Sequence, residues 1–442
     1  MRGRGNRCKG VTISVQLSTS ATLTPTPGLP DDRDFIKLSL IDTPARPMSH
    51  AMADREPHIR PKRQASALPL PDTVALVLQG GGALGSYQAG VIEGLADSGI
   101  EIDWVAGISI GAANAAIVAG NPPHKRVEQL RAFWALLTSA LPSFPIFPND
   151  HIRETLHEWS AGFVLATGVP GFFAPRMLSP VLAVPGTPEA LSFYDSEALR
   201  ETLDAFVDWE LLNHGPVRLS VGAVDVESGN FRFFDTTTDT IDARHIMASG
   251  ALPPGLPPVE IDGRLWWDGG IVSNTPLSHV LDNQSSDLLA FQVDLFSSVA
   301  DRPRTIMDVM ARQKEIQYSS RTRQVSDVLL RIRKDRELAR KVLAKLPPEL
   351  ADDPDVIALA ARSKEDAVNL VQLIYRANAW EGGSRDFEFS ARTMDEHWQA
   401  GLAAVGETMA NARLVAENIE TGKSAAFDLT VHPRHSIATE KS

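Results

Sequence analysis

The sequence predicts an α/β fold in which a mostly parallel sheet lies between two layers of helices and is followed by a helical C-terminal extension. Short apolar runs alternate with helical patterns from residue 72 onward, as expected for parallel strands joined by crossover helices. Glycine-rich turns follow two of these runs, at residues 80–85 and 107–111. After residue 293 the chain changes to long, charged segments of helical character.

The individual elements follow from the length and pattern of each run. Apolar runs of about five residues suit buried parallel strands, and longer patterns rich in Ala, Leu and Glu suit helices. We expect strands at residues 74–78, 104–106, 217–224, 230–234 and 288–293. We expect helices at residues 86–97, 112–119, 127–137 and 197–206.

Changes in composition divide the chain into four regions. The first is rich in Pro, Ser, Thr and Arg and has neither hydrophobic periodicity nor the apolar core of a secretory signal, so we expect it to be disordered. Met48 and Met52 are alternative starts to Met1. The regions are a disordered extension at 1–70, an α/β domain at 72–295 with an insertion at 140–190, a helical region at 300–420 and a tail at 421–442.

Composition restricts the class of protein. At 442 residues the chain is long enough for one large α/β domain with additions, and its longest apolar runs are shorter than a membrane-spanning helix requires. Cys8 is the single cysteine, which excludes an internal disulfide and a cysteine-rich metal site. We expect a cytoplasmic protein without metal or cofactor. The net charge is −12 and we find no nucleic-acid motif, while the oligomeric state stays open.

Ser109 is a candidate nucleophile. It lies between Gly107 and Gly111 in a G-x-S-x-G pattern, after an apolar run and before a helix of small residues. Such a pattern presents a serine on a sharp strand-to-helix turn and points the positive end of the helix dipole at it. The alternative is an ordinary tight turn. Asn114, in the helix that follows, either positions this turn or lies on the helix surface.

The earlier glycine run is a candidate oxyanion hole. Gly80, Gly82 and Gly85 also satisfy the G-x-G-x-x-G pattern of dinucleotide-binding turns. That interpretation requires an acidic residue after the second strand, whereas the next strand here runs into Gly107 and Ser109. The run that includes Gly81 instead offers consecutive backbone N–H groups at a helix start, which suits a developing oxyanion.

Asp268 is a candidate base. It ends the apolar stretch at residues 264–268 and is followed by Gly269 and Gly270, an arrangement that presents a carboxylate at a turn. The alternative is an ordinary Asp-Gly turn. Asp225, at the end of another expected strand, is a rival carboxylate, although a role in capping the following turn fits it better.

The order of these three segments resembles the patatin-like phospholipase family, over about residues 72–294. The resemblance implies a serine–aspartate dyad without histidine, an oxyanion loop at 80–85, and a bacterial subgroup with further similarity at 374–398. Some members carry an arginine near the end of the glycine loop, where this chain has Leu84. That difference leaves the oxyanion to backbone N–H groups.

A serine nucleophile needs a base within hydrogen-bond reach, and histidine is the usual one. The late histidines occur in tail, polar or helical contexts that do not suit a catalytic loop; they are His279, His397, His432 and His435. Asp268 is therefore favoured. An ordinary aspartate is a weak base, so we expect burial beside Trp266 and Trp267 to raise its pKa.

The sequence thus predicts a serine lipid acyl hydrolase. The alternatives are an esterase or depolymerase acting on storage polyester or other acyl esters, and a catalytically silent lipid-binding protein. Aromatic and apolar residues of the insertion either receive an acyl chain or complete the core; they are Phe144, Phe147, Phe163, Phe172, Phe173, Met177 and Leu178. The basic segment at 302–345 either contacts an anionic membrane peripherally or is a solvated helical face.

Overall fold

The computed structural model describes residues 68–140, 150–300, 302–303, 305–363, 366–378 and 380–430. The expected disorder of the N-terminal extension up to residue 67, with Cys8 and the alternative starts, lies outside the described residues. The same holds for Phe144, Phe147 and the tail after residue 430.

The central element is a mixed sheet, for which the described residues supply nine strands in the order β11-β10-β9-β1-β2-β5-β8-β7, with β6 also paired to β5. The strands from β11 to β5 are parallel, and β6, β7 and β8 are antiparallel to their neighbours. Their bounds are β1 Thr73–Leu78, β2 Trp104–Gly107, β5 Arg218–Asp225, β6 Phe231–Asp235, β7 Val259–Ile261, β8 Arg264–Asp268, β9 Leu288–Asp294, β10 Val368–Ile374 and β11 Ala425–Asp428. The mostly parallel sheet and all five expected strands are confirmed.

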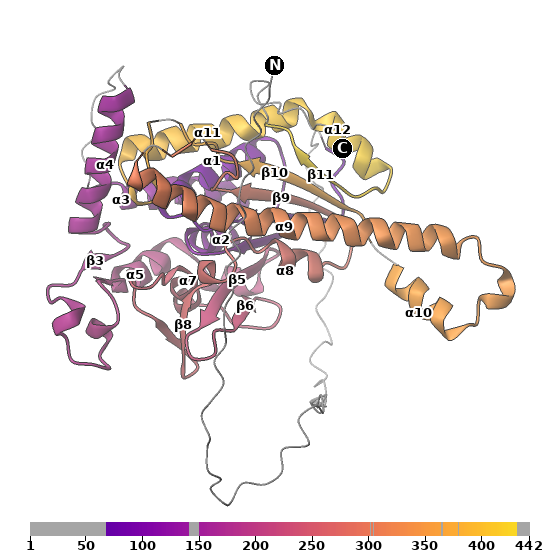
Figure 1. The fold of residues 1–442 in the computed structure, drawn as a ribbon, viewed down its shortest axis with the longest axis horizontal. Coiled ribbons are helices and arrows are strands. Elements are labelled where there is room, and N and C mark those ends of the chain that lie inside the picture. The colour runs from indigo at the N-terminus through magenta and orange to yellow at the C-terminus, as the bar shows by residue number, and fades with distance from the viewer. Residues whose placement is uncertain are drawn as a thin grey trace, which may run out of the picture. The chain divides into compact units, whose positions relative to one another are not determined.

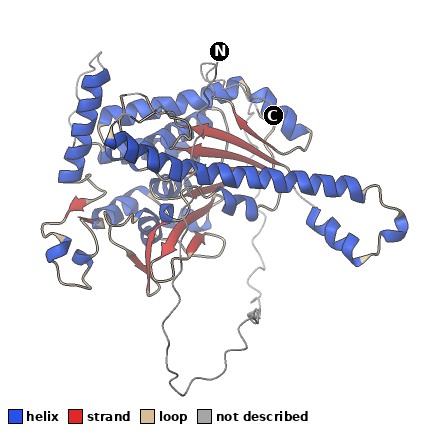
Figure 2. Cartoon of the chain, in the orientation of Figure 1, coloured by secondary structure: helices blue, strands red, loops and turns tan. Residues whose placement is uncertain are grey.

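Helices flank this sheet (Figures 1 and 2). They are α1 Gly85–Asp97, α2 Ile110–Ala119, α3 Pro123–Leu137, α4 Asp150–Thr167, α5 Glu197–Phe206, α6 Trp209–His214, α7 Ala243–Gly250, α8 Leu277–Asp282, α9 Ile306–Leu343, α10 Pro354–Ser363, α11 Ala391–Ala410 and α12 Ala412–Glu420. The four expected helices and the helical character after residue 293 are confirmed. None of the described helices combines the length and hydropathy needed to cross a membrane.

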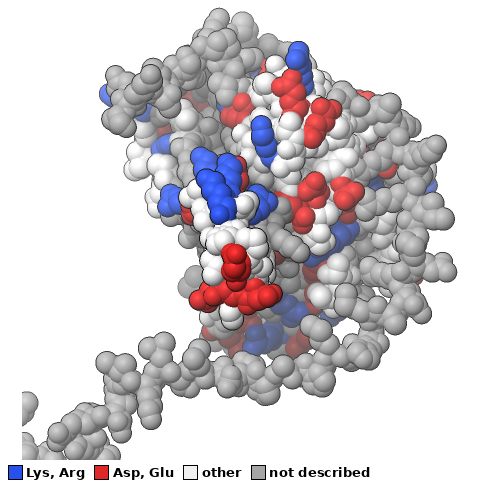
Figure 3. All heavy atoms as spheres, turned by 90° about the vertical axis from the view of Figure 1, so that its right-hand side faces the viewer, with Lys and Arg blue, Asp and Glu red and all other residues white. Residues whose placement is uncertain are grey.

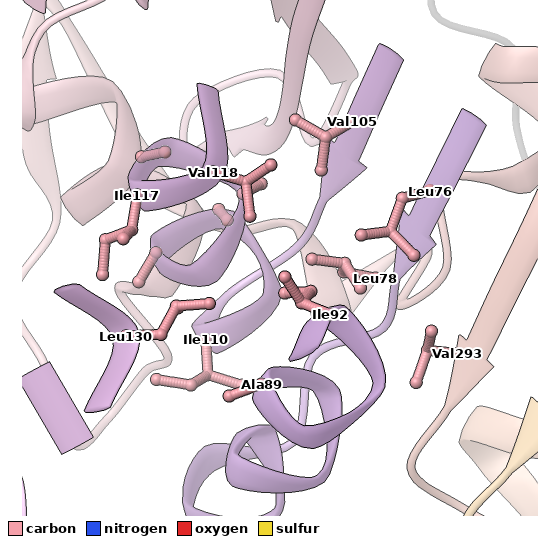
Figure 4. Packing of buried hydrophobic residues seen from close by; sticks show 14 of the residues in the cluster. Leu76, Leu78, Ala89, Ile92, Val105, Ile110, Ile117, Val118, Leu130 and Val293 are labelled. Carbon is pink, nitrogen blue, oxygen red and sulfur yellow. The ribbon is translucent and has the colours of Figure 1, made fainter. Parts of the chain in front are cut away.

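Alternating residues of each strand face opposite layers of the protein. Leu76 of β1 and Val105 of β2 share the larger buried cluster with Ile92 of α1 and Ile117 of α2 (Figure 4). On the other face, Val77 and its neighbours pack in a smaller cluster with residues of α8. The helices on the two faces therefore make the expected three-layer arrangement.

Residues 300–420 are not helical throughout. β10, from Val368 to Ile374, pairs in parallel with β9, and β11 pairs in turn with β10. The run VNLVQLI is a short, nearly continuous apolar stretch, the composition of a strand buried on both faces. The C-terminal region thus extends the same sheet that carries β1 and β2.

The helices α1 and α11 pack side by side through glycines (Figure 1). A Cβ atom on Gly90 would lie 2.0 Å from the carbonyl oxygen of Trp398, and one on Gly401 would lie 2.2 Å from that of Tyr87. No side chain fits at either point, so the two backbones approach as closely as they do only because both residues are glycine.

We therefore expect Gly90→Ala to lower the free energy of unfolding by about 1–3 kcal/mol, because the added methyl group overpacks the contact between α1 and α11. Gly406→Ala is the matched control: its Cβ would meet no atom within 4 Å. That change should be neutral or stabilising by up to about 1 kcal/mol, since alanine is the better helix former. Urea unfolding measures both, and equal stability of Gly90→Ala and the unsubstituted protein would contradict this packing.

Candidate active site

Ser109 occupies the turn between β2 and α2. Its φ angle is 56°, in the left-handed region that non-glycine residues seldom adopt outside strained functional turns. A Cβ on Gly107 would lie 2.3 Å from the carbonyl oxygen of Gly111, and one on Gly111 would lie 2.5 Å from that of Leu78. Both flanking glycines are therefore required by the close approach of backbone to backbone.

The backbone of Ser109 is fixed from two directions. Its N–H lies 3.1 Å from both the carbonyl oxygen and the hydroxyl oxygen of Ser249, at the end of α7. Its carbonyl oxygen accepts a hydrogen bond from the N–H of Ala112 at 2.9 Å, and this bond belongs to the first turn of α2. The side chain thus projects from a constrained turn at the positive end of a helix. Ser249 had no assigned role in the sequence interpretation, because its contact with Ser109 depends on how α7 packs.

Asp268 ends β8 and is 2% exposed. Burial raises the pKa of its carboxyl group to about 7, while hydrogen bonds from the Gly270 N–H and the Ser109 hydroxyl oppose the rise. The Gly270 N–H lies 2.6 Å from the Asp268 Oδ1. The candidate nucleophile therefore lies close enough to the candidate base to affect its pKa, and the expected direction of the pKa shift is confirmed.

The glycine run lies over this pair. A Cβ on Gly80 would be 3.0 Å from the Cβ of Ser109. Gly82 has a φ angle of 55° and begins a short 3-10 turn at Gly82–Leu84, which leads into α1 at Gly85. Within the described part of the chain, the N–H groups of Gly81 and Gly82 make no hydrogen bond to another group of the protein.

Asn274 holds the glycine run at its first residue. The Nδ2 of Asn274 donates to the carbonyl oxygen of Gly80 at 2.8 Å, and the Gly80 N–H donates to the carbonyl oxygen of Asn274 at 3.1 Å. A Cβ on Gly270 would lie 2.7 Å from the Asn274 Oδ1, so the same side chain also lies against the turn that follows Asp268. Asn274 therefore connects the glycine run to the carboxylate turn.

Asn114 is fully buried and does not lie on the helix surface. Its Nδ2 donates at 2.9 Å to both the carbonyl oxygen of Gly85 and the Oε1 of Gln88, and its Oδ1 accepts from the indole N–H of Trp134 at 3.1 Å. The Gln88 Nε2 in turn donates to the carbonyl oxygen of Gln79 at 2.6 Å. A polar network beneath the site thus joins α2 to both ends of the glycine run. The signal for it is an amide inside an otherwise apolar helix.

Asp225 caps a turn, as the alternative interpretation expected. Its Oδ1 accepts from the N–H groups of Glu227 and Ser228, at 3.1 and 2.8 Å, and its Oδ2 pairs with Arg264 at 2.5 Å. The hydrogen bond from the Ser228 N–H is the main cause that lowers the pKa of Asp225. A carboxylate so held is a poor proton acceptor.

The late histidines that the structure describes are bound to other carboxylates. His279 lies 3.2 Å from Asp235 and stacks on Phe233. His397 lies on the helix α11, as expected, and is 1% exposed and 3.5 Å from Glu381. His432 and His435 lie outside the described residues.

The C-terminal region contributes a wall of the site. A Cβ on Gly82 would lie 2.2 Å from the carbonyl oxygen of Asp386, and the Asp386 carboxylate pairs with Lys314 of α9. Burial and then the charge of Asp268 raise the pKa of Tyr318, also on α9. Residues far beyond the third motif therefore pack against the glycine run and lie close enough to Asp268 to feel its charge.

The aromatic insertion divides into two parts. Phe173 is 9% exposed and belongs to the main buried cluster, and Phe172 packs against that cluster. These two complete the core. Phe163, Met177 and Leu178 are 36%, 106% and 51% exposed. Within the described residues, no group of three or more His, Cys, Asp or Glu side chains has the arrangement of a metal site.

Comparison of the sequence with known proteins identifies a family. The sequence model described as Patatin-like phospholipase matches residues 76–281, and a second, described as Patatin phospholipase, matches residues 316–420. The chain is 28% identical over 207 residues to an uncharacterized NTE family protein of Mycobacterium tuberculosis. The aligned stretch covers 47% of this chain and 45% of that protein.

A mammalian relative matches a shorter stretch. Patatin-like phospholipase domain-containing protein 6 of Mus musculus is 41% identical over 95 residues, 20% of this chain and 7% of that protein. The chain thus spans less than half the length of the curated relatives it matches here.

Solved structures resemble the chain more distantly. VipD from Legionella pneumophila has 15% identity and a TM-score of 0.36 over 81% of this chain and 72% of that one. Human GIVD cytosolic phospholipase A2 has 10% identity and a TM-score of 0.34 over 79% and 60%. Together, the two sequence models and the relatives show that this chain belongs to the patatin-like phospholipase family.

Proposed function

We propose that this protein is a serine lipid acyl hydrolase that cleaves carboxylic ester bonds through Ser109 and Asp268. The observation that supports this most strongly is the buried Asp268 carboxyl group, which is 2% exposed, has a pKa raised to about 7, and lies close enough to the Ser109 hydroxyl for that group to oppose the rise. Membership of the family supports lipid esters as the substrate class.

The raised pKa makes Asp268 a competent base. A general base works best when its pKa lies near the operating pH, because it is then both ionised and basic enough to accept a proton. At pKa about 7 the Asp268 carboxylate meets both conditions near neutral pH. It takes the place that histidine occupies in other serine hydrolases.

Ester cleavage then proceeds in two stages. The Ser109 Oγ forms a bond to the carbonyl carbon while its proton passes to Asp268, and the tetrahedral intermediate releases the alcohol, which takes that proton. In the second stage Asp268 takes a proton from water, the hydroxide attacks the acyl-enzyme, and the proton returns to the Ser109 oxygen as the acid leaves.

The N–H groups of Gly81 and Gly82 stabilise the oxyanion of each tetrahedral intermediate. Both are unbonded within the described residues and lie in the run whose first member, Gly80, is next to Ser109. Each donor of this kind contributes about 3 kcal/mol in serine hydrolases. Gly269 and the elbow glycines act by shape, because they allow close backbone contacts, and Gly85 leaves room for the side chains of Ile110 and Trp134.

We expect Ser109→Ala to reduce kcat for p-nitrophenyl butyrate by about 10⁴-fold or more, and Asp268→Asn by about 10⁴-fold, since one removes the nucleophile and the other the base. Asp225→Asn is the matched carboxylate control and should retain kcat within about twofold. Asp268→Asn should unfold at no lower urea concentration than the unsubstituted protein, because it removes a buried charge.

Retained hydrolysis in Asp268→Asn, or its loss in Asp225→Asn with the fold intact, would transfer the role of base away from Asp268. An absence of ester hydrolysis in the folded, unsubstituted protein would favour a lipid-binding role without catalysis.

The pH dependence follows from the same carboxyl group. Because Asp268 acts in its ionised form and its pKa is about 7, the ionised fraction falls about tenfold for each pH unit below 7. We therefore expect kcat/KM for a soluble ester to decline with a slope of one in log units below pH 7 and to level off above pH 8. A profile that stays flat down to pH 5 would show that the base is an ordinary, exposed carboxylate.

A further inference from the structure

The segment 177–193 exposes an unusual amount of aliphatic surface, and we refer to it as the apolar loop. It joins the two strands of a small antiparallel pair, β3 at Ala174–Pro175 and β4 at Tyr194–Asp195. Six of its large apolar side chains are half or more exposed: Met177 106%, Leu178 51%, Val181 86%, Leu182 74%, Val184 70% and Phe193 50%.

Charge is nearly absent from the apolar loop. Glu189 is its single charged residue among seventeen positions, MLSPVLAVPGTPEALSF. Single exposed apolar residues are normal on protein surfaces, whereas a contiguous run of them marks a surface that contacts something apolar. The composition therefore favours an uncharged, water-excluding partner over an acidic or basic one.

The exposed side chains are carried by an ordered loop. Two short 3-10 turns, at Pro180–Leu182 and Pro188–Ala190, fix its course, and three prolines restrict it further. The N–H groups of Phe193 and Tyr194 donate to the carbonyl oxygens of Pro254 and Gly255, at 3.1 and 2.9 Å. The loop therefore presents its aliphatic groups outward while its base is hydrogen-bonded to the body of the protein.

The segment that holds the base of the loop also holds the active site. The carbonyl oxygen of Ala251 accepts from the Asp268 N–H at 3.0 Å, and Ser249, two residues earlier, holds Ser109. Gly255 is only four residues beyond Ala251, a backbone reach of at most about 14 Å. The point where the apolar loop is attached is thus close to the candidate nucleophile and base.

The basic helix α9 is a less suitable contact for a lipid surface. Its exposed Lys341 pairs with Glu337 at 2.6 Å, and acidic residues follow it in residues 349–355. On the face shown in Figure 3, Lys and Arg side chains lie next to Asp and Glu side chains, so they do not form a uniform cationic surface. For residues 302–345, these ion pairs favour the alternative interpretation of a solvated helical face.

We propose that the apolar loop inserts into the surface of a zwitterionic lipid bilayer and thereby holds Ser109 and Asp268 near the membrane. The partner is a lipid–water interface because the loop offers aliphatic groups without charge, which bind by transfer of apolar surface out of water. This inference rests on the proposed function for its purpose, since the bilayer supplies the ester substrate, but the binding itself is independent of catalysis.

The test is sedimentation with phosphatidylcholine vesicles. The double variant Val181→Asp and Leu182→Asp should lower the vesicle partition coefficient at least tenfold, because it places two charges where apolar groups insert. The matched control is Val309→Asp with Met310→Asp, which puts the same change on residues of α9 that are 48% and 60% exposed. The control should partition like the unsubstituted protein, and binding should persist in 0.5 M NaCl.

Activity gives the second readout. The loop variant should hydrolyse the soluble ester p-nitrophenyl acetate at the unsubstituted rate and phosphatidylcholine vesicles at least tenfold more slowly. Loop-dependent binding without any ester hydrolysis would support the docking and refute the proposed function alone.

Three results would overturn the docking proposal. The first is unchanged partition of the loop variant. The second is binding that requires phosphatidylglycerol in the vesicles and is lost in salt, which would indicate a cationic contact. The third is a dimer, seen by analytical ultracentrifugation, that the loop variant converts to monomer while vesicle binding is unaffected, which would make the partner a second copy of this chain.

Discussion

The carboxylate of Asp268 is the group on which the arrangement of the site depends. A buried carboxylate loses its hydration, so its pKa rises to about 7, and the Gly270 N–H and the Ser109 hydroxyl partly replace the lost water. In the proposed mechanism, the same burial that disfavours the charge makes the group basic enough to accept a proton from serine. Stability and reactivity therefore oppose each other at this residue, as expected for a functional site.

The rest of the fold keeps that contact in place. Asn274 forms a hydrogen bond to the glycine run beside Ser109, and Ser249 accepts a hydrogen bond from the Ser109 N–H. The C-terminal region takes part, because β10 extends the sheet beside β9 and the carbonyl group of Asp386 packs on Gly82. The site is accordingly built by residues from both segments that match patatin sequence models, and the second segment is part of the same structural unit.

Much of this was predictable from sequence, because the three motifs are local. The spacing of glycines around Ser109 predicts a sharp turn, and the apolar run before Asp268 predicts a strand. Each of these patterns lies within a few consecutive residues. The missing information concerned contacts between distant segments: Asn274 with Gly80, and Asp386 with Gly82. The burial of Asn114 was missed for a related reason. The sequence of a helix shows which residue is polar, but it does not show which group on another helix forms a hydrogen bond with that residue.

Covalent labelling tests the central claim most directly. A fluorophosphonate reacts fastest with a serine that is activated by a base and placed near oxyanion donors. Intact-mass analysis followed by peptide mapping should find one adduct per chain, on Ser109, with labelling abolished in Ser109→Ala and slowed at least a hundredfold in Asp268→Asn. A folded protein that takes up no label, or that carries the label on another residue, would contradict the account.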